Sequence, residues 1–211
     1  MPFLLRVELP DVPGSLGRVA TAIGEAGGDI EAIEIVEHRG DGTAVDDVLL
    51  DTVPGTMPDS IVSACNALDG VQVLWISRYA GGGGLVLDLE AVEDLTARPD
   101  EALERLVDLL PPVFRSDWAA RLRRTTSASD GEESTVVEVL SASEAAPPVT
   151  TWPDVSKAVR VDVDEVNVVL AAPLGTDEVV LVGRRGGPEY LDSEVARFGH
   201  LVELARTIAR A

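Results

Sequence analysis

Residues 9–16 constrain the fold more than any other segment, because the apolar pattern changes period there. Residues 3–9 alternate in period two, which places Arg6 and Glu8 on the polar face of a half-buried strand. After the turn, apolar residues recur at helical spacing: Leu16, Val19, Ala20 and Ile23. The segment therefore predicts a junction between a strand and a helix.

The turn combines residue types that suit the start of a helix. Asp11 is expected to accept backbone hydrogen bonds, and Gly14 lets the chain pass close to a neighbouring group. The first N–H groups of a helix have no partner within it, so they bind small anions such as the carboxylate of an amino acid. The alternative is that the turn only joins two elements. The residues of the turn do not decide between an anion site and a simple connection.

The first part of the chain predicts four strands and two helices. Gly27 and Gly28 can end the first helix in a left-handed cap. The later elements are expected as strands at residues 30–38, 44–53 and 71–79, with a second helix from Pro58 to Gly70. This order folds as a four-stranded antiparallel sheet with both helices on one face, which is a ferredoxin-like βαββαβ arrangement within an α+β fold.

Residues 3–79 resemble an ACT domain, a small amino-acid-sensing module found in many biosynthetic enzymes and regulators. The first loop of that family reads Asp, any residue, Pro, Gly, any residue, Leu, and residues 11–16 reproduce it. The resemblance implies that two such domains associate and that an amino acid binds where the first loop of one meets the second strand of the other. The matching positions are Asp11, Val12, Pro13, Gly14, Ser15, Leu16, Asp29 and Ile30.

Asp29 departs from the family, which commonly has Asn at this position. A carboxylate there either pairs with the ammonium group of a ligand or weakens binding at a site that has become a dimer contact. The resemblance leaves both possibilities open.

A large excess of acidic residues limits the partners that this chain can bind. The sequence has 17 Lys and Arg against 37 Asp and Glu, a net charge of −20 that repels nucleic acid and anionic lipid. Aromatic residues make up 4% of the chain, too few for a base-stacking surface. There is no apolar run long enough to cross a membrane and no leader-like start, so a cytoplasmic protein is expected.

The sequence lacks the usual patterns of catalytic and metal sites. Cys65 is the only cysteine and shares an apolar helical stripe, so we expect a buried structural residue. His38 and His200 are the only histidines, and no cluster has metal-ligand spacing, so neither a metal nor a cofactor is expected. No nucleophile elbow or Ser, His, Asp set occurs.

Four consecutive glycines at residues 81–84 predict a linker between two domains, 1–80 and 85–211. In the second domain, Pro111 and Pro112 are expected to end a helix. Helices are predicted at residues 88–95, 99–110 and 192–210, strands at 118–124, 135–140, 158–163, 167–172 and 178–184, and a polar loop at 125–134.

The end of the second domain resembles a GAF domain. The resemblance rests on residues 172–175, residues 179–184, Gly187, Pro188, Tyr190 and the helix that follows. It implies an α+β fold that binds cyclic nucleotides, small metabolites or chromophores, or only mediates dimerisation. A covalently attached chromophore is not expected, since this half has no cysteine. Arg184 and Arg185 could hold an anion, but a solvated turn is the expected role.

Together these features predict a non-enzymatic, cytoplasmic regulatory protein that works as a homodimer. It is expected to sense a small molecule, an amino acid in the first instance, at the interface of two ACT domains. The GAF-like domain would pass the change to a partner protein that the sequence does not identify. Two alternatives stay open: a ligand-free dimerisation scaffold, and an enzyme with its chemistry in residues 85–211 that the ACT domain regulates.

Overall fold

In a computed structural model, the chain forms two compact units, Met1–Gly83 and Gly84–Ala211, and each is described by itself. The structure describes residues 2–78, 84–129, 132–163 and 166–210. Of the predicted linker, Gly84 begins a helix, while residues 81–83 lie outside the described residues. The domain boundaries expected from the sequence, 1–80 and 85–211, stay a prediction.

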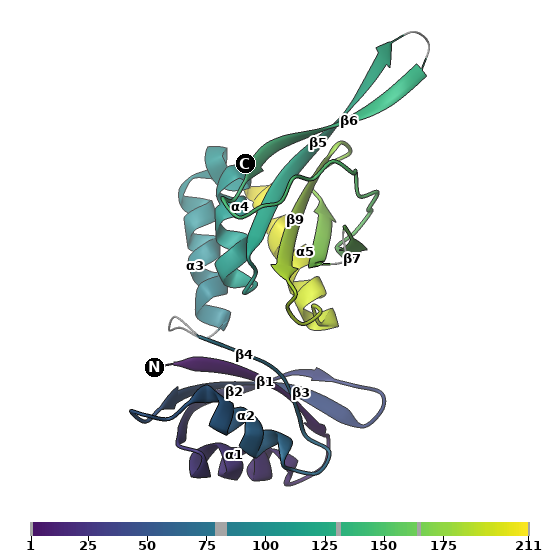
Figure 1. The fold of residues 1–211 in the computed structure, drawn as a ribbon. Helices are drawn as coiled ribbons and strands as arrows, with labels where there is room; N and C mark the ends of the chain where they lie inside the picture. Colours follow the sequence, from purple (N-terminus) through teal and green to yellow (C-terminus); the bar gives the residue numbers. More distant parts are fainter. Residues whose placement is uncertain (1, 79–83, 130–131, 164–165, 211) are drawn as a thin grey trace. The chain divides into compact units, whose positions relative to one another are not determined.

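The first unit has the predicted α+β arrangement. Its elements are β1 (Phe3–Pro10), α1 (Ser15–Glu25), β2 (Gly28–His38), β3 (Thr43–Thr52), α2 (Pro58–Asn66) and β4 (Gln72–Arg78). The strands form one antiparallel sheet in the order β2-β3-β1-β4, and both helices cover the same face (Figure 1). The ferredoxin-like order is confirmed, and it leaves β2 as an edge strand.

One apolar core joins this sheet to its helices. Leu5, Val7 and Leu9 of β1 pack with residues of both helices on this face. The helix residues in the core are Val19, Ile23, Ile61 and Cys65. Burial raises the pKa of the Cys65 thiol, so this residue is an unreactive part of the core.

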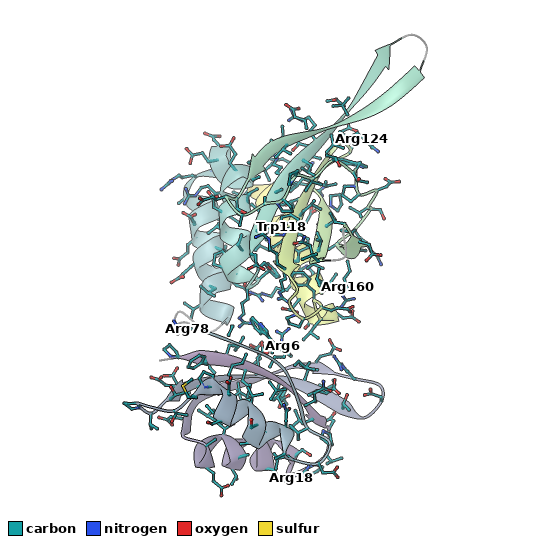
Figure 2. All side chains as sticks on the ribbon, viewed as in Figure 1. Arg6, Arg18, Arg78, Trp118, Arg124 and Arg160 are labelled. Atoms are coloured by element: carbon teal, nitrogen blue, oxygen red, sulfur yellow. The ribbon has the colours of Figure 1, made fainter. Side chains whose placement is uncertain are left out.

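Arg6 lies on the opposite face of β1 from the core residues Leu5, Val7 and Leu9, as the alternation predicts. Its side chain is only 1% exposed, and it projects from the face of the sheet opposite the helices (Figure 2). Its Nε and Nη2 donate to the two carboxylate oxygens of Asp47, directly across on β3, at 2.7 and 2.9 Å. Period-two alternation predicts the face on which Arg6 lies, and the ion pair with Asp47 on the neighbouring strand balances its charge there.

The second unit is built on another antiparallel sheet, in the order β6-β5-β9-β8-β7. Its elements are α3 (Gly84–Ala97), η1 (Pro99–Glu101), α4 (Ala102–Val113), β5 (Trp118–Ser129), β6 (Glu132–Ala142), β7 (Val159–Asp162), β8 (Asn167–Pro173), β9 (Glu178–Arg185) and α5 (Asp192–Ile208). The three α-helices pack on one face, and part of the connection between β6 and β7 covers the other. This confirms the predicted α+β class for the whole chain.

Trp118 fixes the centre of the second face of this sheet. Its ring lies against the backbone of Gly183, where an added Cβ would come within 2.3 Å of ring atoms. The indole Nε1 donates to Oδ1 of Asn167 at 3.0 Å. The close approach requires glycine at position 183. Trp118 is therefore a core residue on this face of the sheet.

Strands β5 and β6 are longer than predicted. The polar segment at residues 125–134 was expected to be a loop, but pairing continues from Thr125 opposite Val136 to Ser129 opposite Glu132. The two strands form a hairpin that extends beyond the rest of the sheet (Figure 1). A hydrogen-bonded ladder needs only backbone groups, so polar side chains do not end it.

Helix α4 also continues past its expected end. It includes Pro111 and Pro112 and ends at Val113. Prolines lack the N–H of two helical hydrogen bonds, but they lie in the last turn, where the N–H of Phe114 donates to the carbonyl of Leu110 at 2.9 Å. The prolines therefore shape the helix end without preventing it.

Arg184 is neither in a solvated turn nor an anion site, because it is a buried residue of β9. Its Nη2 donates to Glu194 at 2.6 Å and to the Phe114 carbonyl at 2.8 Å. The other oxygen of Glu194 accepts from the N–H of Leu191 at 2.8 Å, which caps α5. The guanidinium lies 3.9 Å from the ring centre of Tyr190, and burial raises the pKa of Tyr190 to about 12.

The substitution Arg184→Met is expected to destabilise the protein by about 3–5 kcal/mol, because it leaves the Glu194 carboxylate buried without its ion-pair partner. Urea unfolding at neutral pH measures the change. The control is Arg185→Met, since Arg185 is the exposed neighbour. Equal destabilisation by the two variants would contradict the role given to the buried pair.

Candidate ligand site at the turn between β1 and α1

The turn between β1 and α1 is anchored to the hairpin that joins β2 and β3. The N–H of Asp11 donates to the carbonyl of Gly42 at 2.9 Å. Gly14 precedes the helix with φ of 93°, in the left-handed region that glycine enters at little cost. An added Cβ at Gly14 would meet nothing within 4 Å, so substitution there strains the backbone without a clash.

The start of α1 offers N–H groups to a ligand. The N–H of Ser15 donates to the carbonyl of Val12 at 3.1 Å, and that of Arg18 to the carbonyl of Gly14 at 3.2 Å. Across the described residues, the N–H groups of Gly14, Leu16 and Gly17 have no such acceptor. No side chain caps the helix, and its first turn holds no acidic residue. These N–H groups are placed to bind a carboxylate.

Contrary to expectation, no backbone N–H among the described residues donates to the Asp11 carboxylate. Its Oδ2 lies 2.9 Å from Nδ1 of His38, the last residue of β2. Both side chains are exposed, so this contact ties the turn to the end of the edge strand without closing the site. A protonated His38 makes it an ion pair.

Asp46 is the residue of this site that sequence reasoning missed. It lies on β3, opposite Val7 of β1 and Ile35 of β2, on the face of the sheet that carries the helices. The residue is 2% exposed, and no partner for its Oδ1 exists among the described residues. Burial raises the pKa of Asp46; the nearby His38 lowers it, and Asp11 and Asp47 raise it.

A buried carboxylate oxygen without a partner is costly, so it needs an explanation in the function of the molecule. Ser15 presents a second case, since its hydroxyl is buried at the first position of α1 and likewise lacks a partner among the described residues. A signal for Asp46 was present in the sequence. Two adjacent aspartates, 46 and 47, interrupt the apolar run of β3, and one of the two must face the core.

Asp29 and Ile30 lie at the other end of the sheet. They are the second and third residues of β2 and pair with Asp51 and Leu50, which lie near the start of β1. The 11-residue helix α1, about 16 Å long, runs from the turn back toward that end. Within one chain, the six predicted site residues at 11–16 therefore lie together at the turn, while Asp29 and Ile30 lie at the opposite end of the sheet.

The edge strand β2 exposes apolar side chains next to this site. Ile33 is 36% exposed and Ile35 is 51% exposed, and both pair with β3 residues on the face of the sheet that carries the helices. A shallow hollow of about 370 Å³ starts at the turn and follows α1, lined by Gly14, Gly17, Arg18, Thr21, Ala22, Glu25 and Leu68. The turn is thus open to small molecules and lies beside an uncovered edge strand.

Other candidate chemistry is not brought together. Within residues 2–78, 84–129, 132–163 and 166–210, no group of His, Cys, Asp and Glu is arranged to hold a metal ion. His200 is an exposed residue of α5. No helix in the described part of the chain is both long and apolar enough to cross a membrane.

The first unit is a ferredoxin-like domain with an uncapped helix start beside an exposed edge strand. Residues 3–64 match the family described as "ACT domain", so this unit is an ACT domain, and the resemblance seen in the sequence is confirmed. That match does not extend to the second unit.

A stretch of 33 residues is 64% identical to NAD-dependent malic enzyme 1 of Bacillus subtilis (strain 168). It makes up 16% of this chain, and the chain spans only 8% of the length of that enzyme. The similarity therefore concerns one short segment, and nothing about the activity of the whole enzyme follows from it.

Three solved structures have a low similarity to this chain, over 45–99% of its length. A formyltetrahydrofolate deformylase from Pseudomonas putida KT2440 is 11% identical with a TM-score of 0.31, over 45% of this chain and 38% of that one. A free methionine-R-sulfoxide reductase from Neisseria meningitidis is 11% identical with a TM-score of 0.45, over 63% and 94%. An unknown protein from Galdieria sulphuraria is 12% identical with a TM-score of 0.33, over 99% and 91%. These scores are too low to carry an argument about function.

The substitution Asp46→Asn is expected to raise the melting temperature at pH 7. Because the pKa of Asp46 is raised on folding, stability falls as the pH rises from the pKa of the unfolded chain to that of the folded protein. The gain should disappear below about pH 4, where Asp46 is protonated in both states. Thermal melts from pH 3 to 8 measure it.

The control for this experiment is Asp47→Asn. It removes the charge that Arg6 binds, so it should lower the melting temperature at pH 7. A gain for Asp46→Asn that does not depend on pH, or a loss of stability at pH 7, would show that the Asp46 carboxyl carries no cost of ionisation.

Proposed function

We propose that the ACT domain binds an α-amino acid at the start of α1 and that the protein is a cytoplasmic, non-enzymatic regulator acting as a homodimer. The observations that carry this proposal are the open N–H groups at the start of α1 and the buried carboxylate of Asp46, whose Oδ1 has no partner among the described residues and whose pKa is affected by Asp11 of the turn. The family match of residues 3–64 supports it.

The turn has complementary charge for both ends of an amino acid. The ligand carboxylate accepts hydrogen bonds from the N–H groups of Gly14 and Leu16. The ammonium group is attracted by Asp11 and Asp46; the pKa of Asp46 is raised by burial and by Asp11, and lowered by His38. An amino acid would supply the positive charge that this carboxylate pair lacks.

A second copy of the chain would complete the site. If two β2 strands pair antiparallel about a centre between Ile33 and Glu34, position 29 of one strand falls opposite position 38 of the other. The partner's Asp29 then lies beside His38 and the turn, where one chain alone has no β2 residue from that end. The same pairing covers Ile35 and removes an exposed sheet edge.

The second unit, which we propose to be GAF-like, would pass the change to a partner protein. A ligand shifts the equilibrium between two dimer arrangements only through its different affinity for each, typically about 1–3 kcal/mol. The alternatives are a ligand-free scaffold and an enzyme regulated by the ACT domain. Activity that survives deletion of residues 1–80 would favour the enzyme.

A thermal-shift screen of the amino acids, followed by calorimetry, tests the proposal. Gly14→Val should abolish binding, because the side chain strains a left-handed position at the point where the ligand carboxylate docks. Asp29→Ala and Asp46→Asn should each weaken binding about ten- to a hundredfold, the loss expected for one charge-assisted hydrogen bond.

The matched control is Asp108→Ala, which removes an exposed carboxylate from α4 in the second unit and should bind like the wild type. If no amino acid binds the wild-type protein at millimolar concentration, the ACT domain is a scaffold. If all the variants bind normally, the ligand site lies elsewhere.

Light scattering is expected to give twice the chain mass of 22.3 kDa at micromolar concentration. Ile35→Glu should shift the protein toward the monomer, because it places a charge in the middle of the proposed strand pair. The control is Val86→Glu, at an exposed position of α3. A wild-type monomer, or a dimer that Ile35→Glu leaves intact, would contradict pairing through β2.

A further inference from the structure

The helix-facing side of the first sheet buries a carboxyl group among mostly apolar neighbours. Asp46 is 2% exposed, and its cross-strand neighbours are Val7 of β1 and Ile35 of β2. Ala44 and Val48, the next residues of β3 on the same face, are buried as well. The Asp46 carboxyl group is therefore transferred from water into largely apolar surroundings when the chain folds.

These surroundings favour the protonated form of the Asp46 carboxyl group. Burial is the largest cause of the raised pKa of Asp46, and no donor to its Oδ1 exists among the described residues to offset that effect. A proton bound to the carboxyl group removes the cost of a buried charge. The charge of Asp46 therefore depends on whether a cation lies beside it.

The charged groups that act on Asp46 are Asp11, Asp47 and His38. Asp11 of the turn and Asp47, the next residue of β3, raise the pKa of Asp46, while His38 at the end of β2 lowers it. Asp47 is itself paired with Arg6 on the other face of the sheet. Nδ1 of His38 lies 2.9 Å from Oδ2 of Asp11. One imidazole therefore acts on two carboxyl groups, those of Asp11 and Asp46.

Within the described residues, the elements packed against this face add no further charge to it. The residues that β1, α1 and α2 contribute to the core are uncharged. Cys65 of α2 is titratable, but its raised pKa keeps the thiol neutral. Arg18 of α1 is exposed and lines the hollow along the helix. A further positive charge beside Asp46 has to come from a bound molecule.

The ammonium group of an amino acid and a proton have opposite effects on this carboxyl group. An ammonium group nearby favours the ionised form, because an opposite charge lowers the pKa of an acid. A proton on the carboxyl group removes the charge that attracts the ammonium. Binding of the amino acid and binding of the proton are therefore competing, linked equilibria.

We propose that the amino-acid site is linked to pH: binding releases a proton from Asp46 to the solvent, and acidification releases the amino acid. This inference rests on the proposed function, because it concerns the same site. His38 acts in the same direction, since its protonation adds a positive charge beside Asp11 and Asp46. The occupancy of the site then reports amino-acid concentration and acidity together.

Calorimetry of the full chain from about pH 4.5 to 7 tests the proposal, with the standard amino acid of largest thermal shift as the probe. The association constant should fall as the pH is lowered, by up to about tenfold per pH unit, the limit for release of one proton. Exposed carboxylates and the amino group of the probe keep their charge over most of this range. Titrations in buffers of different ionisation enthalpy count the protons released.

The variant His38→Asn separates the two titrating groups, because asparagine cannot take up a proton in this range. In this background the fall in affinity at acidic pH should remain. Adding Asp46→Asn should weaken binding at pH 7 about ten- to a hundredfold and remove the fall. The matched control is Asp59→Asn, at an exposed position of α2 in the same unit, which should keep the fall.

The outcomes separate this inference from the proposed function. If none of the standard amino acids binds, both are wrong. If one binds with an affinity that does not change over this pH range, the site stands and the linkage is wrong. The same conclusion follows if the change survives in the double variant.

Carbon NMR of the aspartate carboxyl groups tests the linkage on the wild-type protein. The Asp46 signal, identified by its loss in Asp46→Asn, should titrate at a higher pH than the signals of exposed aspartates. Saturation with the probe should move this titration to lower pH. A titration midpoint that the probe leaves unchanged would overturn the proposal.

Discussion

The bidentate ion pair between Arg6 and Asp47 fixes the register of β1 against β3, and the candidate ligand site depends on that register. Adjacent residues of a strand point to opposite faces, so pairing Asp47 with Arg6 directs Asp46 to the face that carries the helices. A slip of one residue would exchange the two carboxylates and place Asp47 against the apolar core. The buried pair thus decides which aspartate lies near the turn before α1.

A buried ion pair of arginine also links structural elements in the second unit. Arg184 is buried among backbone carbonyls and Glu194, and Glu194 in turn caps α5, so one ion pair joins the sheet to the last helix. Glu178 reverses the arrangement, because one carboxylate holds two arginines.

Much of the fold was predictable because local patterns and tertiary structure agree. The turn at residues 11–16, the strand order and the core around Cys65 all follow from apolar spacing and turn residues. The pairing of Arg6 with Asp47 and the burial of Asp46 escaped prediction because both depend on residues far away in sequence. The length of β5 and β6 escaped prediction because backbone pairing continues through a polar segment. Asp29 and Ile30 lie apart from the turn within one chain, so their role in the site depends on the proposed dimer.

The separation of Asp29 from the turn along α1 has a consequence for how such a sensor would behave in a cell. If the site is complete only where two chains meet, ligand binding and chain association are one linked equilibrium. The apparent affinity for the ligand then rises with the concentration of the protein. At low protein concentration, the sensor would not respond to ligand concentrations that it detects when the protein is abundant. The expression level of the protein would then help to set the ligand concentration at which the sensor responds, as the side chains of the site do.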